Sequence, residues 1–189
     1  VKFPQGIHED MFDNFFKNCD LFIDGLDFFA IHVRSKAFQY CYEHNIPAIT
    51  AAPLGLGASM LSFLPNQQSF EQYFRLNNQP PQEQILRFLT GLAPSSLHRK
   101  ALVDPSRVQL AAQKAPSLTI GCELSAALCA SQSFKILLKR GLVISAPKSL
   151  HFDAYTYQMR VSWRPLGAYN PLQIWQRFWV RKAFTTSNR

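Results

Sequence analysis

Residues 20–57 read DLFIDGLDFFAIHVRSKAFQYCYEHNIPAITAAPLGLG and decide the fold. A short apolar run, Leu21 to Ile23, ends in two carboxylates and is followed by a helical pattern from Phe28 to His44. A second apolar run, Ile46 to Ala51, then opens into a glycine loop. Short continuous apolar runs are typical of parallel strands covered on both faces. The order predicts a βαβ unit, whose connection is right-handed almost without exception.

The two carboxylates, Asp24 and Asp27, form the first candidate site. In open α/β sheets, ligands bind outside the carboxyl ends of the strands, which is where this loop falls. Two carboxylates three residues apart can hold Mg²⁺ beside a nucleotide. The alternative is that Asp27 caps the helix opening at Phe28 and favours its positive N-terminus. The local pattern alone favours the cap.

The glycine loop contains Pro53, Gly55 and Gly57. It has a G-x-G pattern without a third glycine, and it leads into a predicted strand at 58–64 instead of a helix. A dinucleotide-binding fingerprint requires the opposite context. These glycines therefore predict a sharp turn and a close backbone approach to a neighbour.

The remaining pattern predicts an α/β fold with a mixed sheet and flanking helices. Helices are expected at 8–17, 69–74 (with Ser69 as the N-cap), 82–90, 105–113, 120–140 and 171–184, and two antiparallel strands at 150–153 and 158–163. The helix at 120–140 has a predicted apolar side made of Leu124, Ala127, Leu128, Phe134, Leu137 and Leu138.

The last helix is amphipathic, and the predicted buried face contains Leu172, Trp175 and Trp179. We expect this face to pack against its own domain or against a partner subunit. The alternative is that the face binds an anionic membrane or nucleic acid, because basic residues stand beside it: Arg177, Arg181 and Lys182.

Composition limits the class of protein. The 189 residues are 47% hydrophobic and carry a formal net charge of +8, with many basic residues late in the chain. A solvated basic tail explains that charge, so neither nucleic acid nor membrane is expected as a partner. No apolar run reaches the roughly 20 residues of a spanning helix. The four cysteines form no Cys-x-x-Cys pair, which argues against a zinc site and for a reducing, cytoplasmic compartment.

The histidines show no metal-ligand spacing. Among them, His151 stands out because it lies in a predicted strand, two residues before Asp153.

Several of these motifs together resemble the ThiF/MoeB/HesA family, the bacterial relatives of ubiquitin-activating enzymes. The resemblance runs to about Gln173 and rests on the Asp24-x-x-Asp27 loop, the Pro53-Leu54-Gly55-x-Gly57 loop and a series of later segments: 63–65, 70–74, 91–94, 103–108, 150–153 and 170–173. It implies a partial adenylating domain at residues 1–173, followed by a C-terminal amphipathic helix and tail at 174–189.

The resemblance implies an activity as well. Members of the family use ATP to convert a carboxylate into an acyl-adenylate, and the carboxylate is commonly the C-terminus of a ubiquitin-like sulfur carrier. The second carboxylate of the family loop, which serves Mg²⁺ and ATP, corresponds to Asp27, and Asp24 matches the first. Pro53, Gly55 and Gly57 are expected to shape the acyl end of the pocket. A homodimer is implied on the same grounds.

Departures from the family pattern leave two readings open. The family often has Asn after the second carboxylate, where this chain has Phe28, and no Cys between Ala58 and Gly121 could form a thioester. The family's glycine-rich ATP loop and phosphate-clamping residues precede the region seen here. We therefore expect a C-terminal fragment of an adenylyltransferase, inactive by itself. The alternative is a non-catalytic protein-binding module of the same fold.

Overall fold

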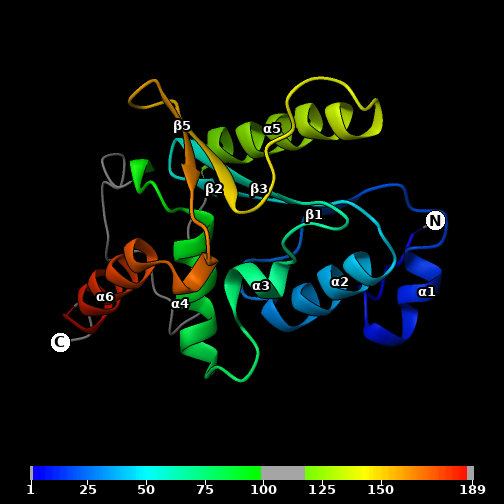
Figure 1. Ribbon diagram of the computed structural model, residues 1–189, viewed down its shortest axis with the longest axis horizontal. Coiled ribbons are helices and arrows are strands. Elements are labelled where there is room, and N and C mark those ends of the chain that lie inside the picture. The colour runs from blue at the N-terminus through cyan, green and yellow to red at the C-terminus, as the bar shows by residue number, and fades with distance from the viewer. Residues whose placement is uncertain (1, 99–117, 187–189) are drawn as a thin grey trace.

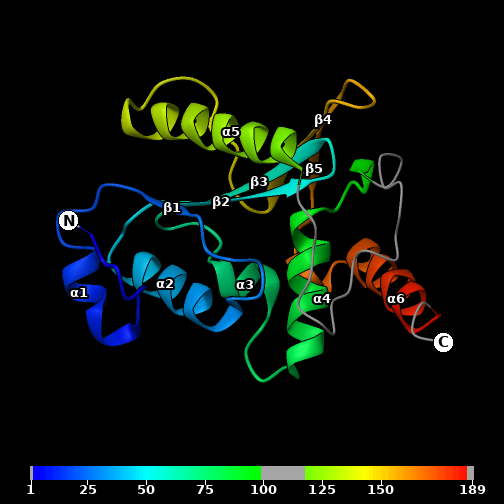
Figure 2. The same cartoon turned by 180° about the vertical axis from the view of Figure 1, so that it is seen from behind.

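The computed structural model describes residues 2–98 and 118–186, apart from the side chains of 183–186. A central sheet has helix α5 on one side and the other helices on the opposite side and at one end (Figures 1 and 2). The elements in chain order are η1 Glu9–Met11, α1 Phe12–Phe15, β1 Phe22–Asp24, α2 Ile31–Glu43, β2 Ala48–Leu54, β3 Gly57–Phe63, α3 Phe70–Phe74, α4 Pro81–Leu92, α5 Thr119–Leu137, β4 Lys148–Asp153, β5 Gln158–Trp163, η5 Gly167–Tyr169 and α6 Pro171–Thr186.

The sheet has five strands in the order β1-β2-β3-β4-β5, which confirms the predicted α/β class with a mixed sheet. Strands β1 and β2 are parallel, with Asp24 opposite Thr50, as the βαβ pattern predicted. The other three pairs are antiparallel. Strand β3 is buried along its whole length, so it forms the centre of the domain.

The main core lies between the sheet and helices α2, α3 and α4. It is rich in aromatic rings. The ring of Phe38 stacks on that of Phe70 with 4.5 Å between the ring centres, and the ring centres of Phe74 and Phe88 are 5.1 Å apart. Ser69 caps α3 as predicted, and Gln72 completes a capping box with it. Ten of the sixteen phenylalanines in the sequence belong to this core or pack against it.

The apolar side predicted for helix α5 is only partly buried: Leu124 and Leu128 are half-buried, and Leu128 packs against the core. The buried residues of α5 are Gly121, Ser125, Cys129 and Gln132, whereas Phe134, Leu137 and Leu138 are exposed. Small residues allow the helix to approach the sheet closely: a Cβ on Gly121 would lie 2.7 Å from the carbonyl oxygen of Gly55. Close approach, and not side-chain size, decides which side of this helix is buried.

Helix α6 begins at Pro171 as predicted, but the predicted packing of its Leu172–Trp175–Trp179 face against its own domain is wrong. Leu172, Trp175 and Trp179 are 58%, 65% and 44% exposed, while Gln173 and Arg177 are buried. Gln173 donates a hydrogen bond to the Tyr73 hydroxyl. The inner contact of this helix is therefore polar. Trp163, in β5, is 62% exposed as well.

Two predictions are not tested by the described residues. The helix expected at 105–113 falls outside the described residues. The division of the chain at residue 173 stays a prediction, and it would cut α6 after its third residue. No described helix is long and apolar enough to cross a membrane.

Candidate functional site

The acidic loop begins where β1 ends, and its first carboxylate is fully engaged. Asp24 is 6% exposed. Its Oδ2 accepts hydrogen bonds from Arg34 Nε at 2.6 Å and from Thr50 Oγ1 at 2.8 Å. Its Oδ1 accepts a third bond from the Leu26 amide at 3.0 Å. Both oxygens are thus occupied by protein donors, which gives Asp24 a structural part in the loop.

Arg34 organises the loop from the first turn of α2. Its guanidinium, which is 3% exposed, donates to the carbonyl oxygens of Leu26 at 2.7 Å, Asp27 at 3.0 Å and Phe28 at 3.2 Å. The same group lies 4.7 Å from the ring centre of Phe88. A buried guanidinium needs its donors satisfied, and here loop carbonyls satisfy them. The ion pair and these bonds together fix the path of residues 24–28.

Asp27 differs from Asp24 because its side chain is exposed. Its Oδ1 accepts a hydrogen bond from the Phe29 amide at 2.9 Å, which closes a local turn. The hypothesis that Asp27 caps a helix opening at Phe28 is wrong: α2 begins at Ile31, and its N-cap position is Ala30, without a side-chain bond. The loop therefore presents the Asp27 carboxylate to solvent.

The Pro53–Gly57 loop is the turn of the β2–β3 hairpin. Gly55 has a φ of +61°, a conformation that favours glycine. A Cβ on Gly57 would collide with the Phe152 carbonyl oxygen and lie 2.9 Å from the Asp153 Cα. The predicted sharp turn and close backbone approach are both confirmed.

The acidic loop and this turn lie at the same end of the sheet. Thr50 stands opposite Asp24, and β2 continues four residues farther, to Leu54. At about 3.3 Å per residue, the turn lies roughly 13 Å beyond the end of β1. The structure thus puts both predicted segments at one edge, but no contact between the two segments appears among the hydrogen bonds of the described residues.

Sequence reasoning missed Arg34 and Thr50. A signal for Arg34 was present, because it falls on the buried stripe of α2 with Ile31, Ala37 and Phe38. A charged residue on such a stripe requires a buried partner. Thr50 gave no such signal, since a threonine is common in any strand.

A second polar cluster surrounds His151 on β4. His151 is buried, and its Nδ1 shares a 2.5 Å hydrogen bond with Ser95 Oγ. Burial lowers the pKa of His151 to about 4, against the opposing effect of nearby Asp153. Nε2 of His151 and Oδ1 of Asp153 have no hydrogen-bond partner within the described structure. His151 is therefore neutral at physiological pH and far from a general base matched to pH 7.

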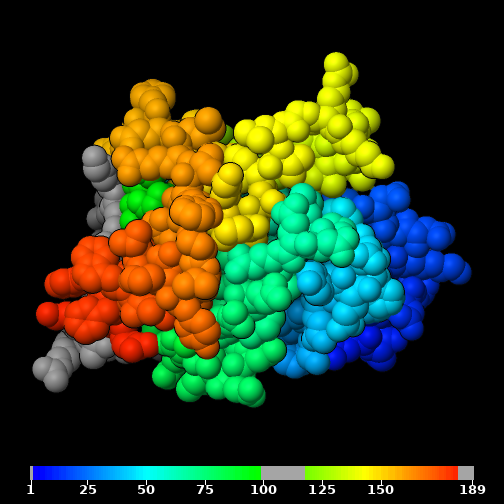
Figure 3. Space-filling model, in the orientation of Figure 1, coloured from blue at the N-terminus to red at the C-terminus, as the bar shows by residue number. Residues whose placement is uncertain are grey.

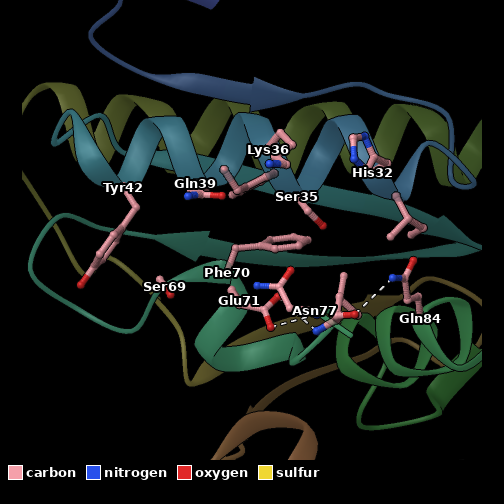
Figure 4. A pocket seen from close by; sticks show the side chains of 13 residues that line it. His32, Ser35, Lys36, Gln39, Tyr42, Ser69, Phe70, Glu71, Asn77 and Gln84 are labelled. Atoms are coloured by element: carbon pink, nitrogen blue, oxygen red, sulfur yellow. Dashed lines mark hydrogen bonds between the residues drawn. The ribbon is translucent and has the colours of Figure 1, made fainter. Parts of the chain in front are cut away.

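A groove of about 410 Å³ runs along α2 (Figure 4). His32, Lys36 and Tyr42 line one wall, and Ser69 and Glu71 the other. None of the predicted site residues lines it. The Glu71 carboxylate already accepts the amides of the two residues Leu76 and Asn77, so the groove has no unused acid at that point.

Metal binding by side chains alone has little support. Within the described residues, no group of three or more His, Cys, Asp or Glu side chains could hold a metal ion. The four cysteines are free. Mg²⁺ is commonly held by one or two carboxylates together with substrate phosphates and water. The exposed carboxylate of Asp27 fits that second arrangement.

Comparison with known proteins gives both a fold and a family. The fold is similar to Escherichia coli MccB with MccA-N7isoASN (TM-score 0.56, 13% identity, 92% of this chain and 45% of that chain) and to E. coli MccB with ATP (TM-score 0.53, 15% identity, 88% and 43%). It is also similar to PaaA (TM-score 0.50, 16% identity, 83% and 46%). The chain spans less than half the length of these proteins. No curated protein matches the sequence.

The family model is the decisive comparison. The model described as ThiF family matches residues 1–171, which include the acidic loop, the hairpin turn and all five strands. A match over nine tenths of the sequence shows the family, whereas structural similarity at sequence identities this low shows only the fold. The chain belongs to the ThiF family.

Proposed function

We propose that this chain is the C-terminal part of an ATP- and Mg²⁺-dependent adenylyltransferase that activates a carboxylate. The observation that carries the proposal is the Asp24–Asp27 loop. It lies at the carboxyl end of a parallel strand, where ligands of open α/β sheets bind, and it exposes one carboxylate on a backbone held by Arg34. The family match and the likeness to a structure of MccB with ATP support the same activity.

The substrate proposed is the C-terminus of a ubiquitin-like or sulfur-carrier protein, or of a peptide. The peptide alternative is supported by the likeness to MccB, of which structures with MccA are known. In such a reaction a carboxylate oxygen bonds to the α-phosphorus of ATP. The bond from that phosphorus to the bridging oxygen breaks, and pyrophosphate leaves. Pro53, Gly55 and Gly57 are proposed to shape the acyl end of the pocket.

Roles within the acidic loop follow from the geometry. Asp27 is proposed as the Mg²⁺ ligand, and the metal would neutralise phosphate charge when bound. Asp24 acts through Arg34: it fixes the guanidinium that holds the carbonyl oxygens of Leu26, Asp27 and Phe28. Asp24 is therefore a positioning residue in this proposal, and Asp27 the one that touches the ligand.

The experiment is ATP–pyrophosphate exchange by the full-length parent protein. Asp27→Asn should lower exchange by about 100-fold or more, because a carboxylate ligand is lost, with little change in stability. Asp10→Asn is the matched control, since Asp10 is another exposed carboxylate and its loss should leave exchange unchanged. Unaltered exchange by the Asp27→Asn protein would refute the assigned role. The 189-residue chain alone is expected to show no exchange, because its sequence has no glycine-rich phosphate loop.

A second candidate function is a non-catalytic protein-binding module of the same fold. The observation that favours it is the complete use of Asp24 by protein donors, which leaves the loop a single available carboxylate. A parent protein that shows no exchange with any carboxylate partner, yet binds a protein partner tightly, would support this reading.

A further inference from the structure

Helix α6 packs against the domain through polar side chains. Gln173 donates a hydrogen bond to the Tyr73 hydroxyl, and Gln176 donates one to the carbonyl oxygen of Ala93 at 2.9 Å. Arg177, four positions after Gln173, is buried on the same side of the helix. Figures 1 and 2 show α6 at one end of the molecule, with α4 as its neighbour. The side of α6 that the domain covers is therefore its polar side.

The opposite side of α6 is apolar and exposed, and we call it the outer face. It consists of Leu172, Ile174, Trp175, Phe178 and Trp179, which are 44–65% exposed. The ring centres of Trp175 and Trp179 are 6.2 Å apart, and those of Phe178 and Trp179 are 5.8 Å apart, so the aromatic side chains form a continuous patch. Figure 3 shows α6, in red, at the left margin of the molecule. An exposed apolar patch of this kind marks an interaction site.

The part of the chain that carries the outer face is basic. Residues 154–189 contain no Asp or Glu, and their Lys and Arg residues are Arg160, Arg164, Arg177, Arg181, Lys182 and Arg189. Lys182 lies at the C-terminal end of the outer face, with its Nζ 5.5 Å from the ring centre of Trp179. Beneath the helix, the carboxylate of Glu83 meets three arginines, so positive charge is in excess there as well. The surroundings of the outer face therefore complement an anionic partner.

The residue types favour an anionic membrane as that partner. A helix with Trp, Phe and Leu on one face and cations beside it binds in the interface of anionic bilayers, where Trp is enriched because its ring is amphipathic. Lys182 can reach lipid phosphates while its methylene stem stays on the apolar surface. Nucleic acids are bound chiefly through Lys and Arg contacts with phosphates. The middle of the outer face has no such residue, and its aliphatic residues, Leu172 and Ile174, cannot stack on bases as aromatic rings do.

We propose that the outer face of α6 is a docking surface for an anionic lipid membrane. The helix lies in the plane of the headgroups, with its aromatic side chains at the acyl boundary and its polar side attached to the domain. The composition predicted no membrane partner, because a solvated basic tail explains the net charge; the exposed aromatic patch beside that charge is what the tail does not explain. The proposal goes beyond the adenylation reaction and is independent of it, since no residue of the acidic loop takes part.

Vesicle flotation of the full-length parent protein tests this surface. The protein should float with vesicles of phosphatidylcholine containing about 30% phosphatidylserine. Trp175→Ser should lower the partition coefficient by about ten-fold, because a large aromatic side chain no longer enters the acyl boundary. Phe134→Ser is the matched control: it removes a 66% exposed aromatic side chain from α5, on the other side of the sheet, and should change the coefficient by less than about two-fold. A protein that stays with the aqueous fraction would overturn the proposal, and so would equal losses in the two variants.

The charge of the vesicle gives a second test. Vesicles of phosphatidylcholine alone should bind the protein at least about ten-fold more weakly, because the basic residues lose their attraction to the surface. Lys182→Gln should weaken binding to the anionic vesicles by about five-fold and leave the weak binding to neutral vesicles unchanged. Equal binding to both kinds of vesicle would refute an anionic membrane as the partner. Binding to single-stranded RNA without binding to either vesicle would assign the face to nucleic acid and refute the proposal.

Discussion

Two buried arginines, Arg34 and Arg177, hold different parts of this molecule by different arrangements of charge. Arg34 is 3% exposed, and its one ion-pair partner among the described residues is Asp24, at 2.6 Å. Arg177 is 7% exposed and shares Glu83 with two other arginines, Arg87 and Arg181. In the acidic loop one carboxylate serves one guanidinium. Beneath α6 one carboxylate serves three.

The difference shows how strongly the stability of each site depends on a single arginine. Removal of Arg34 would leave Asp24 as a buried charge without a cationic partner and leave three loop carbonyls without their donor. Removal of one arginine from the Glu83 cluster would leave two others within reach of the carboxylate. The first arrangement is therefore fragile to a single substitution, and the second is redundant on its basic side.

The largest expected effect is that of Arg34→Met. The free energy of unfolding should fall by about 3–5 kcal/mol, because breaking a buried ion pair leaves an uncompensated charge. Urea denaturation measures the change. The double variant Arg34→Met with Asp24→Asn should recover part of the loss, since the stranded charge is also removed. A loss below about 1 kcal/mol in the single variant would show that the two arginine sites do not differ in the way described.

Glu83→Gln should have an intermediate effect. The carboxylate accepts a hydrogen bond from Arg87 at 2.8 Å and lies 3.5 Å from Arg177. Its loss should lower the free energy of unfolding by about 2 kcal/mol, the usual worth of a hydrogen bond to a charged group. Arg87→Met should cost less than Glu83→Gln, because the other arginines still face the carboxylate. An equal or larger cost for Arg87→Met would contradict the redundancy.

The same carboxylate should make stability depend on pH. Burial by itself would raise the pKa of Glu83, but the hydrogen bond from Arg87 and the charges of Arg177 and Arg181 outweigh it and hold the pKa below its ordinary value. The folded protein therefore gives up this proton more readily than the unfolded chain does. The stabilisation is present above the unfolded pKa of about 4.3 and is lost as pH falls through the lower, folded pKa. The difference in stability between wild type and Glu83→Gln should shrink across that acidic window.

The smallest expected effect is that of Trp175→Ser on the outer face of α6. Trp175 is 65% exposed, so the free energy of unfolding should change by less than about 0.5 kcal/mol.

The tryptophan emission of the free protein should be red-shifted and accessible to quenchers, since all three tryptophans are substantially exposed. Blue-shifted, quencher-resistant emission would instead mean that this face is covered. A shift only on adding anionic vesicles or nucleic acid would favour the alternative of an anionic partner.

The sequence by itself determined the order of elements at the start of the domain. Residues 20–57 contain two apolar runs, a helical pattern and a glycine turn, and the structure has β1, α2, β2 and β3 in that order. Local patterns suffice here because each run is short, apolar and bounded by turn residues. The same pattern put the Asp24–Asp27 loop at the carboxyl end of β1, which is where it lies.

Only the tertiary structure decided which carboxylate is available and which helix face is buried. Asp24 and Asp27 look alike in the sequence, and the difference comes from Arg34 and Thr50, which reach Asp24 across 10 and 26 positions. Helices α5 and α6 have apolar residues on more than one side, so periodicity alone could not choose between their faces. Gly121 brings α5 against the hairpin turn, and Glu83, 94 positions from Arg177, draws the polar side of α6 inward. Contacts so distant in sequence leave no periodic signal, because each is made by a single side chain whose partner is fixed only when the chain folds.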